Sequence, residues 1–422
     1  MYLRTPKKYQ KGGGRGISRR SLLLAIFAGL GILLADFTWR NRAPLQEITM
    51  NLIATAENQA ETMAAPAPTP TPFVDPMICL SRANTAYDMG NLIEAIEQYH
   101  CAIDGLPNDV ALHTQLAFLL IVSNRPQEGL EVAKRAILAD PTAPDGYAIA
   151  GMATDWIAYA TGDKELYGKA LAYVLRALDI NPNYADAYAF MAEIYTDQGR
   201  YNEAYAMAEK ALELDPENFK AHRNYGTALE SQGYYEEAAA RFEQAIVING
   251  RMPYIRIQLA RMYFNLHRID DAMDLLLQAV QLTGGDPESY YWLGLGYSRY
   301  QGDYTSAQRT WETCVDVDPN YRPCWERLAG VLIFNQNYDM ALNAYEKAID
   351  LDSTDPEVYY YAAFINQLNG HCNESIRLAQ LGLSLENLEP SEEDDLREML
   401  SECRGGSSIN TTPTDTEGDA DQ

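Results

Sequence analysis

Residues 287–320 read PESYYWLGLGYSRYQGDYTSAQRTWETCVDVDPN, and this stretch contains the pattern that decides the fold. Tyr290, Leu293 and Tyr297 lie three and four residues apart, so they share one face of a helix. Small residues between them, and again further along, allow two helices to approach closely. The same spacings recur about every 34 residues from residue 76 to residue 389. Each unit therefore predicts a helix, a turn and a second helix.

Glycines and prolines mark the limits of the predicted helices. A turn residue after a helix end often needs a positive φ, and four turns hold glycine there: Gly90, Gly199, Gly233 and Gly370. A proline cannot continue a helix, and one ends each of the first four units: Pro107, Pro141, Pro182 and Pro216. We count nine units, at residues 76–109, 110–143, 144–184, 185–218, 219–252, 253–286, 287–321, 322–355 and 356–389.

Two of the nine units depart from the common length. The third is about seven residues too long near Trp156, which predicts either a longer first helix or a loop in place of its turn. The seventh is about one residue too long near Gln301.

This pattern resembles the tetratricopeptide repeat, a helical hairpin that cannot bury its apolar face alone and therefore stacks on its neighbours. The resemblance implies an all-α fold, a right-handed α-solenoid of about nine helix–turn–helix units with a concave surface that can hold a partner. An amphipathic stretch over 390–403 is expected to form a helix that caps the array. The acidic tail 404–422 has almost no large apolar residue and is expected to be disordered.

The N-terminal part differs in kind from the repeats. Residues 1–20 are rich in lysine and arginine and contain no acid, and an apolar run from Leu22 to Ala35 follows. A basic segment before an apolar run stays in the cytoplasm. We therefore expect 1–20 to be cytoplasmic and 21–40 to be a transmembrane signal-anchor. A single-pass protein of bacterial origin with extracytoplasmic repeats would result.

A cleaved export signal is the alternative to a retained anchor. Arg19 and Arg20 precede the apolar run as they would in a twin-arginine signal, although no convincing cleavage site follows Ala35. Residues 41–75 include a stretch in which proline alternates with alanine and threonine, typical of an extended, semi-rigid spacer. Such a spacer would hold the repeats away from the membrane surface.

The cysteines become informative once the register of the tetratricopeptide resemblance is applied. This register makes neighbours of three pairs: Cys79 with Cys101, Cys314 with Cys324, and Cys372 with Cys403. It therefore implies three disulfides, which would require an oxidising compartment and agree with export. The alternative is a set of reduced cysteines that occupy small-residue positions.

The resemblance also implies which side chains line the concave wall. Read onto this sequence, it places an aromatic and arginine-rich peptide-binding groove at Arg223, Tyr254, Arg261, Phe264, Tyr291, Arg299, Phe334, Tyr360 and Phe364. Aromatic rings would serve as anchors, and guanidinium groups as forked donors to carboxylates or backbone. The same register puts Glu193, Asp197 and Glu230 on this wall. The alternative is that the arginines pair with these acids.

Charge and motif content exclude other classes of function. The formal net charge is −26, which opposes nucleic-acid binding because that depends on neutralising phosphates. The five histidines are scattered over different repeats, and no phosphate-binding loop, metal-ligand spacing or nucleophile elbow occurs in the sequence. We therefore expect a protein that is not an enzyme and takes no cofactor, metal or small-molecule substrate.

Together these features predict a membrane-tethered, extracytoplasmic scaffold or assembly factor that binds a partner protein or peptide. A protein that recognises a nonprotein envelope ligand, such as a glycan, is the alternative.

Overall fold

The computed structural model describes residues 75–283, 286–385 and 388–405. Within these ranges the chain forms helices and no strand, so the all-α prediction is confirmed there. The expectations for the basic segment 1–20, the signal-anchor 21–40, all but the last residue of the spacer 41–75 and most of the tail 404–422 lie outside the described residues. Among the helices that the structure describes, none is long and apolar enough to cross a membrane.

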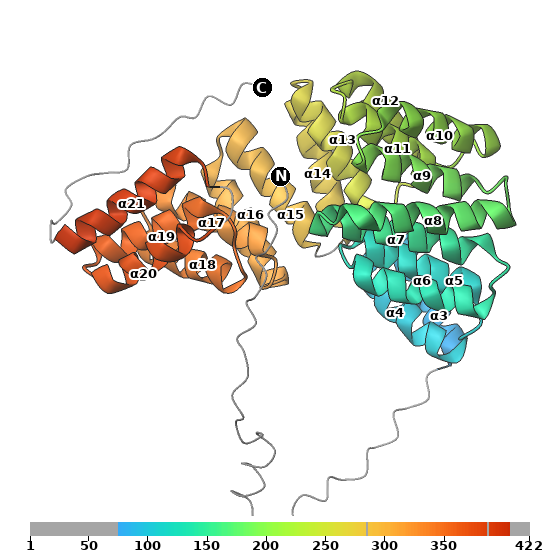
Figure 1. Ribbon diagram of the computed structural model, residues 1–422, viewed down its shortest axis with the longest axis horizontal. Helices are drawn as coiled ribbons and strands as arrows, with labels where there is room; N and C mark the ends of the chain where they lie inside the picture. The colour runs from blue at the N-terminus through green and yellow to red at the C-terminus, as the bar shows by residue number, and fades with distance from the viewer. Residues whose placement is uncertain (1–74, 284–285, 386–387, 406–422) are drawn as a thin grey trace, which may run out of the picture. The chain divides into compact units, whose positions relative to one another are not determined.

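The helices pair in chain order as hairpins (Figure 1). The pairs are α3 (Pro76–Asp88) with α4 (Leu92–Gly105), α5 (Val110–Val122) with α6 (Pro126–Ala139), α7 (Pro144–Thr161) with α8 (Lys164–Ile180), α9 (Ala185–Asp197) with α10 (Tyr201–Leu214), α11 (Phe219–Glu230) with α12 (Tyr235–Ile248), α13 (Pro253–Asn265) with α14 (Ile269–Thr283), α15 (Pro287–Leu295) and η1 (Gly296–Gln301) with α16 (Tyr304–Val317), α17 (Arg322–Phe334) with α18 (Tyr338–Asp350), and α19 (Pro356–Leu368) with α20 (Cys372–Gly382). The last helix, α21 (Pro390–Gly405), packs on α19 and α20.

The turn inside each hairpin needs a left-handed residue, as the glycines indicated. Gly90, Gly199, Gly233 and Gly370 all have φ between 71° and 77°. Three hairpins reach the same backbone conformation without glycine, at Asn124, His267 and Gln336, where φ is 57° to 59°. The turn geometry is therefore common to the hairpins although its residue type is not.

The extra residues of the third unit lengthen both of its helices. Helix α7 has 18 residues where α9 has 13, and α8 has 17 where α10 has 14. Gly162, with φ of 69°, ends α7 in a short turn, so the longer-helix alternative is the correct one. The hairpin therefore extends beyond its neighbours and carries Trp156 and Tyr159 near its tip.

The additional residue of the seventh unit is taken up inside its first helix. After Leu295 the helix continues as the π-helical segment η1, which ends at Gly302 with φ of 66°. A π-helix closes its hydrogen bonds over five residues instead of four, so it accommodates an inserted residue without a loop.

The core lies between the helices and consists largely of alanine, leucine and aromatic side chains. The eighth residue of the first helix is fully buried in six hairpins, where it is alanine: Ala83, Ala117, Ala192, Ala260, Ala329 and Ala363. At the C-terminal end, Leu396 and Met399 of α21 are buried against the last hairpin. Helix α21 thus covers an apolar face that would otherwise meet water, as a capping helix does.

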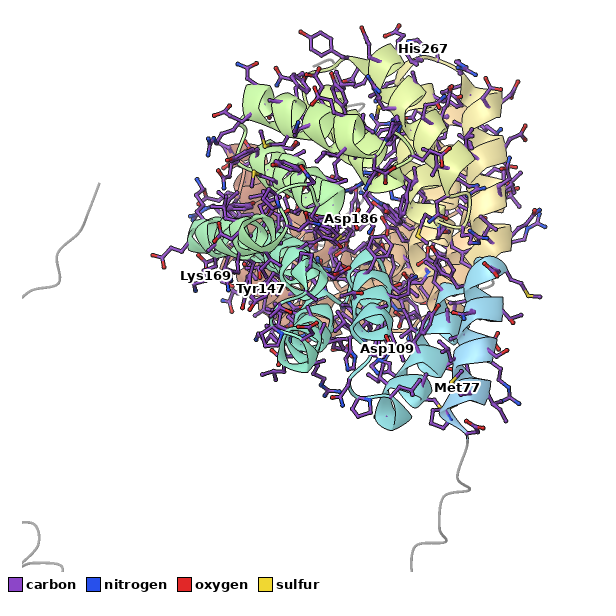
Figure 2. The ribbon with its side chains drawn as sticks, turned by 90° about the vertical axis from the view of Figure 1, so that its right-hand side faces the viewer. Met77, Asp109, Tyr147, Lys169, Asp186 and His267 are labelled. Atoms are coloured by element: carbon purple, nitrogen blue, oxygen red, sulfur yellow. A yellow bond between two sulfur atoms is a disulfide. The ribbon has the colours of Figure 1, made fainter. Side chains whose placement is uncertain are left out.

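The first hairpin also contacts the sixth, far along the chain. The Asn249 side chain donates to the Tyr87 hydroxyl at 3.1 Å, and Arg251 forms an ion pair with Asp88 at 3.0 Å. A Cβ atom at Gly90 would lie only 2.9 Å from the Leu282 side chain, so this side chain packs directly on the Gly90 backbone. Figure 2 shows α3 and α4 in blue beside α13 and α14 in yellow. The first six hairpins are therefore joined end to end.

Candidate functional site

A cavity of about 700 Å³ lies among the helices that the structure describes. Its lining comes mainly from the first helices of successive hairpins, from α7 through α9, α11 and α13 to α15. The side chains that dominate this wall are Trp156, Glu193, Arg223, Tyr254, Arg261 and Trp292. The wall is therefore the surface that the tetratricopeptide register assigns to first helices.

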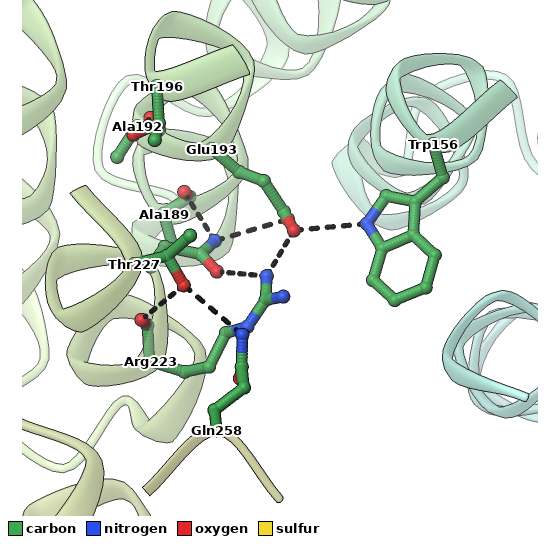
Figure 3. Close-up of polar contacts among 9 residues, drawn as sticks. Trp156, Ala189, Ala192, Glu193, Thr196, Arg223, Thr227 and Gln258 are labelled. Carbon is green, nitrogen blue, oxygen red and sulfur yellow. Dashed lines mark hydrogen bonds and ion pairs between the residues drawn. The ribbon is translucent and has the colours of Figure 1, made fainter. Parts of the chain in front are cut away.

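A buried ion pair between Glu193 and Arg223 forms the centre of one side of the cavity (Figure 3). The Arg223 guanidinium also donates to Gln258 Oε1 at 3.1 Å and to Asn224 Oδ1 at 2.8 Å. The Trp156 indole donates to Glu193 Oε1 at 3.0 Å. Trp156, Glu193, Arg223 and Gln258 come from α7, α9, α11 and α13 respectively. Their hydrogen bonds therefore join four helices. Truncating one member would leave a buried charge without its partner.

Aromatic rings flank this arginine. The Arg223 guanidinium carbon lies 5.8 Å from the ring centre of Trp156 and 5.5 Å from that of Tyr254. Both distances are within the range in which a ring face attracts a cation. Burial raises the pKa of the Tyr254 hydroxyl, so this ring stays neutral.

A second arginine occupies a similar environment. Arg261 forms an ion pair with Glu230 at 2.7 Å, and its guanidinium carbon lies 5.3 Å from the Trp292 ring centre. Burial raises the pKa of the Glu230 carboxyl, although Arg261 opposes this shift. Each cavity arginine therefore has one carboxylate and at least one aromatic ring as neighbours.

Three further carboxyl groups belong to the same region. Burial, with the negative charge of Glu193, raises the pKa of Asp197 to about 7. Asp155 is fully buried directly behind it, and burial together with Asp197 raises the pKa of Asp155 well above its usual range. Glu288 lies in α15, later in the chain, and burial and the nearby Asp286 raise its pKa to about 7. The cavity is therefore acidic overall, with groups that change charge near neutral pH.

Models of protein families match several parts of the chain. The model described as Anaphase-promoting complex, cyclosome, subunit 3 matches residues 197–279, and two models described as Tetratricopeptide repeat match 163–223 and 288–321. One described as TPR repeat matches 334–370. These matches fall on the hairpins described above. The chain is a tetratricopeptide-repeat protein.

Solved structures with the same fold are related to this tetratricopeptide-repeat protein only distantly. The heterotetramer Cut9–Hcn1 of the APC/C matches with a TM-score of 0.53 and 19% identity, over 73% of this chain and 59% of that chain. Yeast Tom70 matches with a TM-score of 0.46 and 14% identity, over 79% of this chain and 89% of that chain. This chain thus spans about three fifths of the length of the first of these. No curated protein matches it.

The structure brings three of the nine predicted groove residues into the cavity of this tetratricopeptide-repeat protein: Arg223, Tyr254 and Arg261. The remaining six are outside its lining. Among them Phe264 stacks on Tyr300 at 3.9 Å between ring centres, and Arg299 lies 6.0 Å from the same ring. The other four lie farther along the array.

Those four residues contact aromatic neighbours. Tyr291 meets the edge of Trp292 at 5.6 Å, and Phe334 packs on Tyr304 at 4.2 Å. Tyr360 and Phe364 stack on each other at 6.4 Å. The alternative weighed for the groove, in which the arginines pair with nearby acids, holds for Arg223 and Arg261.

Residues outside the predicted groove set also line the cavity. Trp156 and Tyr159 come from the lengthened α7, and Glu288 and Trp292 come from α15. The surplus length of the third unit was the signal that pointed to Trp156 and Tyr159. Glu288 is the second residue of α15, as the predicted Tyr254 is of α13, so its position in the repeat was a signal that could have found it.

The six cysteines form three bonded pairs, and they are the pairs that the register implied: Cys79–Cys101, Cys314–Cys324 and Cys372–Cys403. Their Cα atoms lie 5.8, 6.2 and 5.4 Å apart. These distances are typical of disulfides. In the ranges that the structure covers, no three His, Cys, Asp or Glu side chains gather closely enough to hold a metal ion.

Proposed function

We propose that this tetratricopeptide-repeat protein is a non-catalytic scaffold that holds a partner polypeptide against the first helices of its second to seventh hairpins. The cavity carries this proposal. Its volume of about 700 Å³ is that of a specific binding site, and its wall combines aromatic anchors with fixed polar groups. The solved structure most similar in TM-score among those described above is a hetero-tetramer, so the same fold supports assembly there.

We further propose that the scaffold is tethered to a membrane through residues 21–40, with its hairpins outside the cytoplasm. The basic residues before the apolar run support this orientation. The three bonded cysteine pairs support it independently, because disulfides persist in oxidising compartments. Protease added to spheroplasts should then degrade the hairpins, and full protection would contradict the orientation.

Site-specific cross-linking tests the partner proposal. A photoreactive benzoylphenylalanine placed at Tyr159, which lines the cavity yet is 72% exposed, should capture a partner polypeptide in cells. The matched control carries the same group at Val247, which is 78% exposed on α12 and does not line the cavity. Products of equal yield from both positions would show that the cavity has no special role.

A glycan is the second candidate ligand. The rings of Trp156, Tyr159 and Trp292 all line the cavity, and aromatic rings with polar neighbours also suit a sugar. Pull-down from detergent-solubilised membranes separates the two candidates. A stoichiometric protein partner favours the scaffold, whereas purified envelope glycan that raises the melting temperature, without a protein partner, favours the alternative.

A further inference from the structure

The lining of the cavity contains more carboxyl groups than arginines. Its charged lining consists of two arginines and four carboxyl groups: Arg223, Arg261, Glu193, Asp197, Glu230 and Glu288. Each arginine already has a carboxylate partner, Glu193 for Arg223 and Glu230 for Arg261. Asp197 and Glu288 have no lysine or arginine within ion-pair distance among the described residues. Arg223 attracts Asp197 and Arg261 attracts Glu288 from beyond that distance, so neither acid has an ion-pair partner of its own in this part of the chain.

A buried acid, Asp155, interacts with this lining through Asp197. Asp155 has no exposed surface. A hydrogen bond joins its carboxyl to that of Asp197, and it also interacts electrostatically with Glu193 and Arg223. A cation that enters the cavity would relieve the repulsion between the Asp197 and Glu193 carboxylates.

The aromatic side chains suit a cation as well. The two arginines of the chain itself show how this wall holds a guanidinium group, between a carboxylate and the face of Tyr254 or Trp292. Trp156 and Tyr159 line the cavity together with Asp197 and extend its aromatic surface. A net charge of −26 for the chain would also draw a basic partner toward it.

We propose that the cavity receives a lysine or arginine side chain of the partner polypeptide, with Asp197 and Glu288 supplying the opposite charge. This proposal rests on the proposed scaffold function and adds the chemistry of its partner. It also reverses the recognition expected from the sequence, in which arginines of the groove would bind carboxylates. Those arginines are already paired, so an acidic partner would have to break two ion pairs to reach them.

Two peptide libraries provide the test. Both consist of random nonapeptides, one with a central arginine and the other with a central citrulline, which has the same shape but no charge. The full chain in detergent is immobilised at pH 8, and bound peptides are quantified by mass spectrometry. The arginine library should be enriched at least tenfold over the citrulline library. In the Asp197→Asn/Glu288→Gln double variant, this preference should fall at least tenfold.

A second double variant controls for the loss of negative charge. Asp179→Asn/Glu131→Gln removes two carboxylates that are exposed and outside the cavity, so it should keep the preference for arginine. Circular dichroism should show both variants folded. Equal enrichment of the two libraries, no enrichment of either, or an equal loss in both variants would overturn the proposal. So would a stabilising effect of spermidine without peptide binding, which would assign the cavity to a polyamine.

The failure of this inference can be told apart from a failure of the scaffold function. If a partner cross-links at Tyr159 and still does so in the Asp197→Asn/Glu288→Gln variant, the scaffold function stands. The proposal that the cavity receives a basic side chain of the partner is then wrong. If nothing cross-links at Tyr159 in the wild-type chain, both proposals fail together.

Discussion

The eighth residue of each first helix determines how closely that helix approaches its partner in the hairpin. Three hairpins hold glycine there, and each glycine faces a large side chain of the second helix. A Cβ atom would lie 2.4 Å from Val174 at Gly151, 2.9 Å from Phe242 at Gly226, and 2.3 Å from Trp311 at Gly294. The size of one residue is thus matched by the size of the residue that it touches.

Replacing Gly294 by alanine should lower the free energy of unfolding by about 1–3 kcal/mol, because a well-packed core must be displaced. The added methyl group collides with the Trp311 indole, which donates to the Tyr291 carbonyl at 3.2 Å. Thermal denaturation followed by circular dichroism measures the effect. Gly330→Ala is the control, since nothing lies within 4 Å of that exposed helical position. It should stabilise by about 0.5–1 kcal/mol, and a comparable loss in both variants would refute the explanation.

The hairpin turns allow a stabilising substitution. His267 is exposed and has φ of 57°, a conformation that costs a residue with a Cβ atom about 1 kcal/mol. His267→Gly should therefore raise the melting temperature by a few degrees. Gly199→Ala, at the equivalent turn with φ of 71° and no neighbour within 4 Å, should lower it. Changes of the same sign in the two variants would show that side-chain contacts, and not φ, control these turns.

At the scale of elements, the lengthened α7 is the feature that builds the cavity wall. Its Trp156 indole donates a hydrogen bond to Glu193 of α9, and its Asp155 carboxyl contacts that of Asp197. The inserted residues thus add function-bearing side chains without adding a loop. The π-helical segment η1 positions an aromatic contact outside the cavity, since its Tyr300 stacks on Phe264 of α13.

The contact between α7 and α9 should make stability depend on pH. Asp155 and Asp197 have raised pKa values in the fold, that of Asp197 to about 7, so the folded chain binds more protons than the unfolded chain between pH 4 and 7. Other groups that face the pair are Glu193, Arg223 and Tyr167. The stabilisation is fully present at about pH 4 and is lost as the pH rises through 7.

Melting temperatures of the wild-type chain should accordingly fall between pH 5 and pH 8. One pKa unit of difference corresponds to about 1.4 kcal/mol. In the Asp155→Asn/Asp197→Asn variant, neither group titrates, so the fall should be smaller. Glu288 still titrates in that variant and leaves a residual slope. A steeper fall in the variant than in the wild type would contradict the assignment.

At the scale of the whole molecule, two of the three disulfides lie at the ends of the array, Cys79–Cys101 within the first hairpin and Cys372–Cys403 between the last hairpin and α21. The bond between Cys372 and Cys403 closes a loop of 31 residues and fixes α21 to α20. Replacing both cysteines by serine should cost about 3 kcal/mol and raise hydrogen exchange in α21. The bond between Cys314 and Cys324 spans only 10 residues, so its removal should cost less. Free thiols in non-reducing peptide maps would contradict the pairing.

The fold followed from the sequence because its signal is repeated. Nine copies of one spacing predict the hairpins, their turns and the neighbours of each cysteine, since every copy meets the same packing problem. The site followed only in part. Arg223, Tyr254 and Arg261 line the cavity, because position in a first helix determines which way a side chain faces.

The amino-acid sequence by itself determined that helical hairpins stack and which of their faces form the wall, because both depend on spacing within one unit. Only the tertiary structure decided the chemistry of that wall. Whether an arginine is available depends on which acid of the next hairpin reaches it, as Glu193 reaches Arg223. The pKa of Asp197 depends in the same way on how deeply α7 and α9 bury it. Ion pairs and pKa shifts of this kind arise between neighbouring hairpins. Their strength depends on burial and on the distance between the groups, which the spacing of residues within one repeat does not determine.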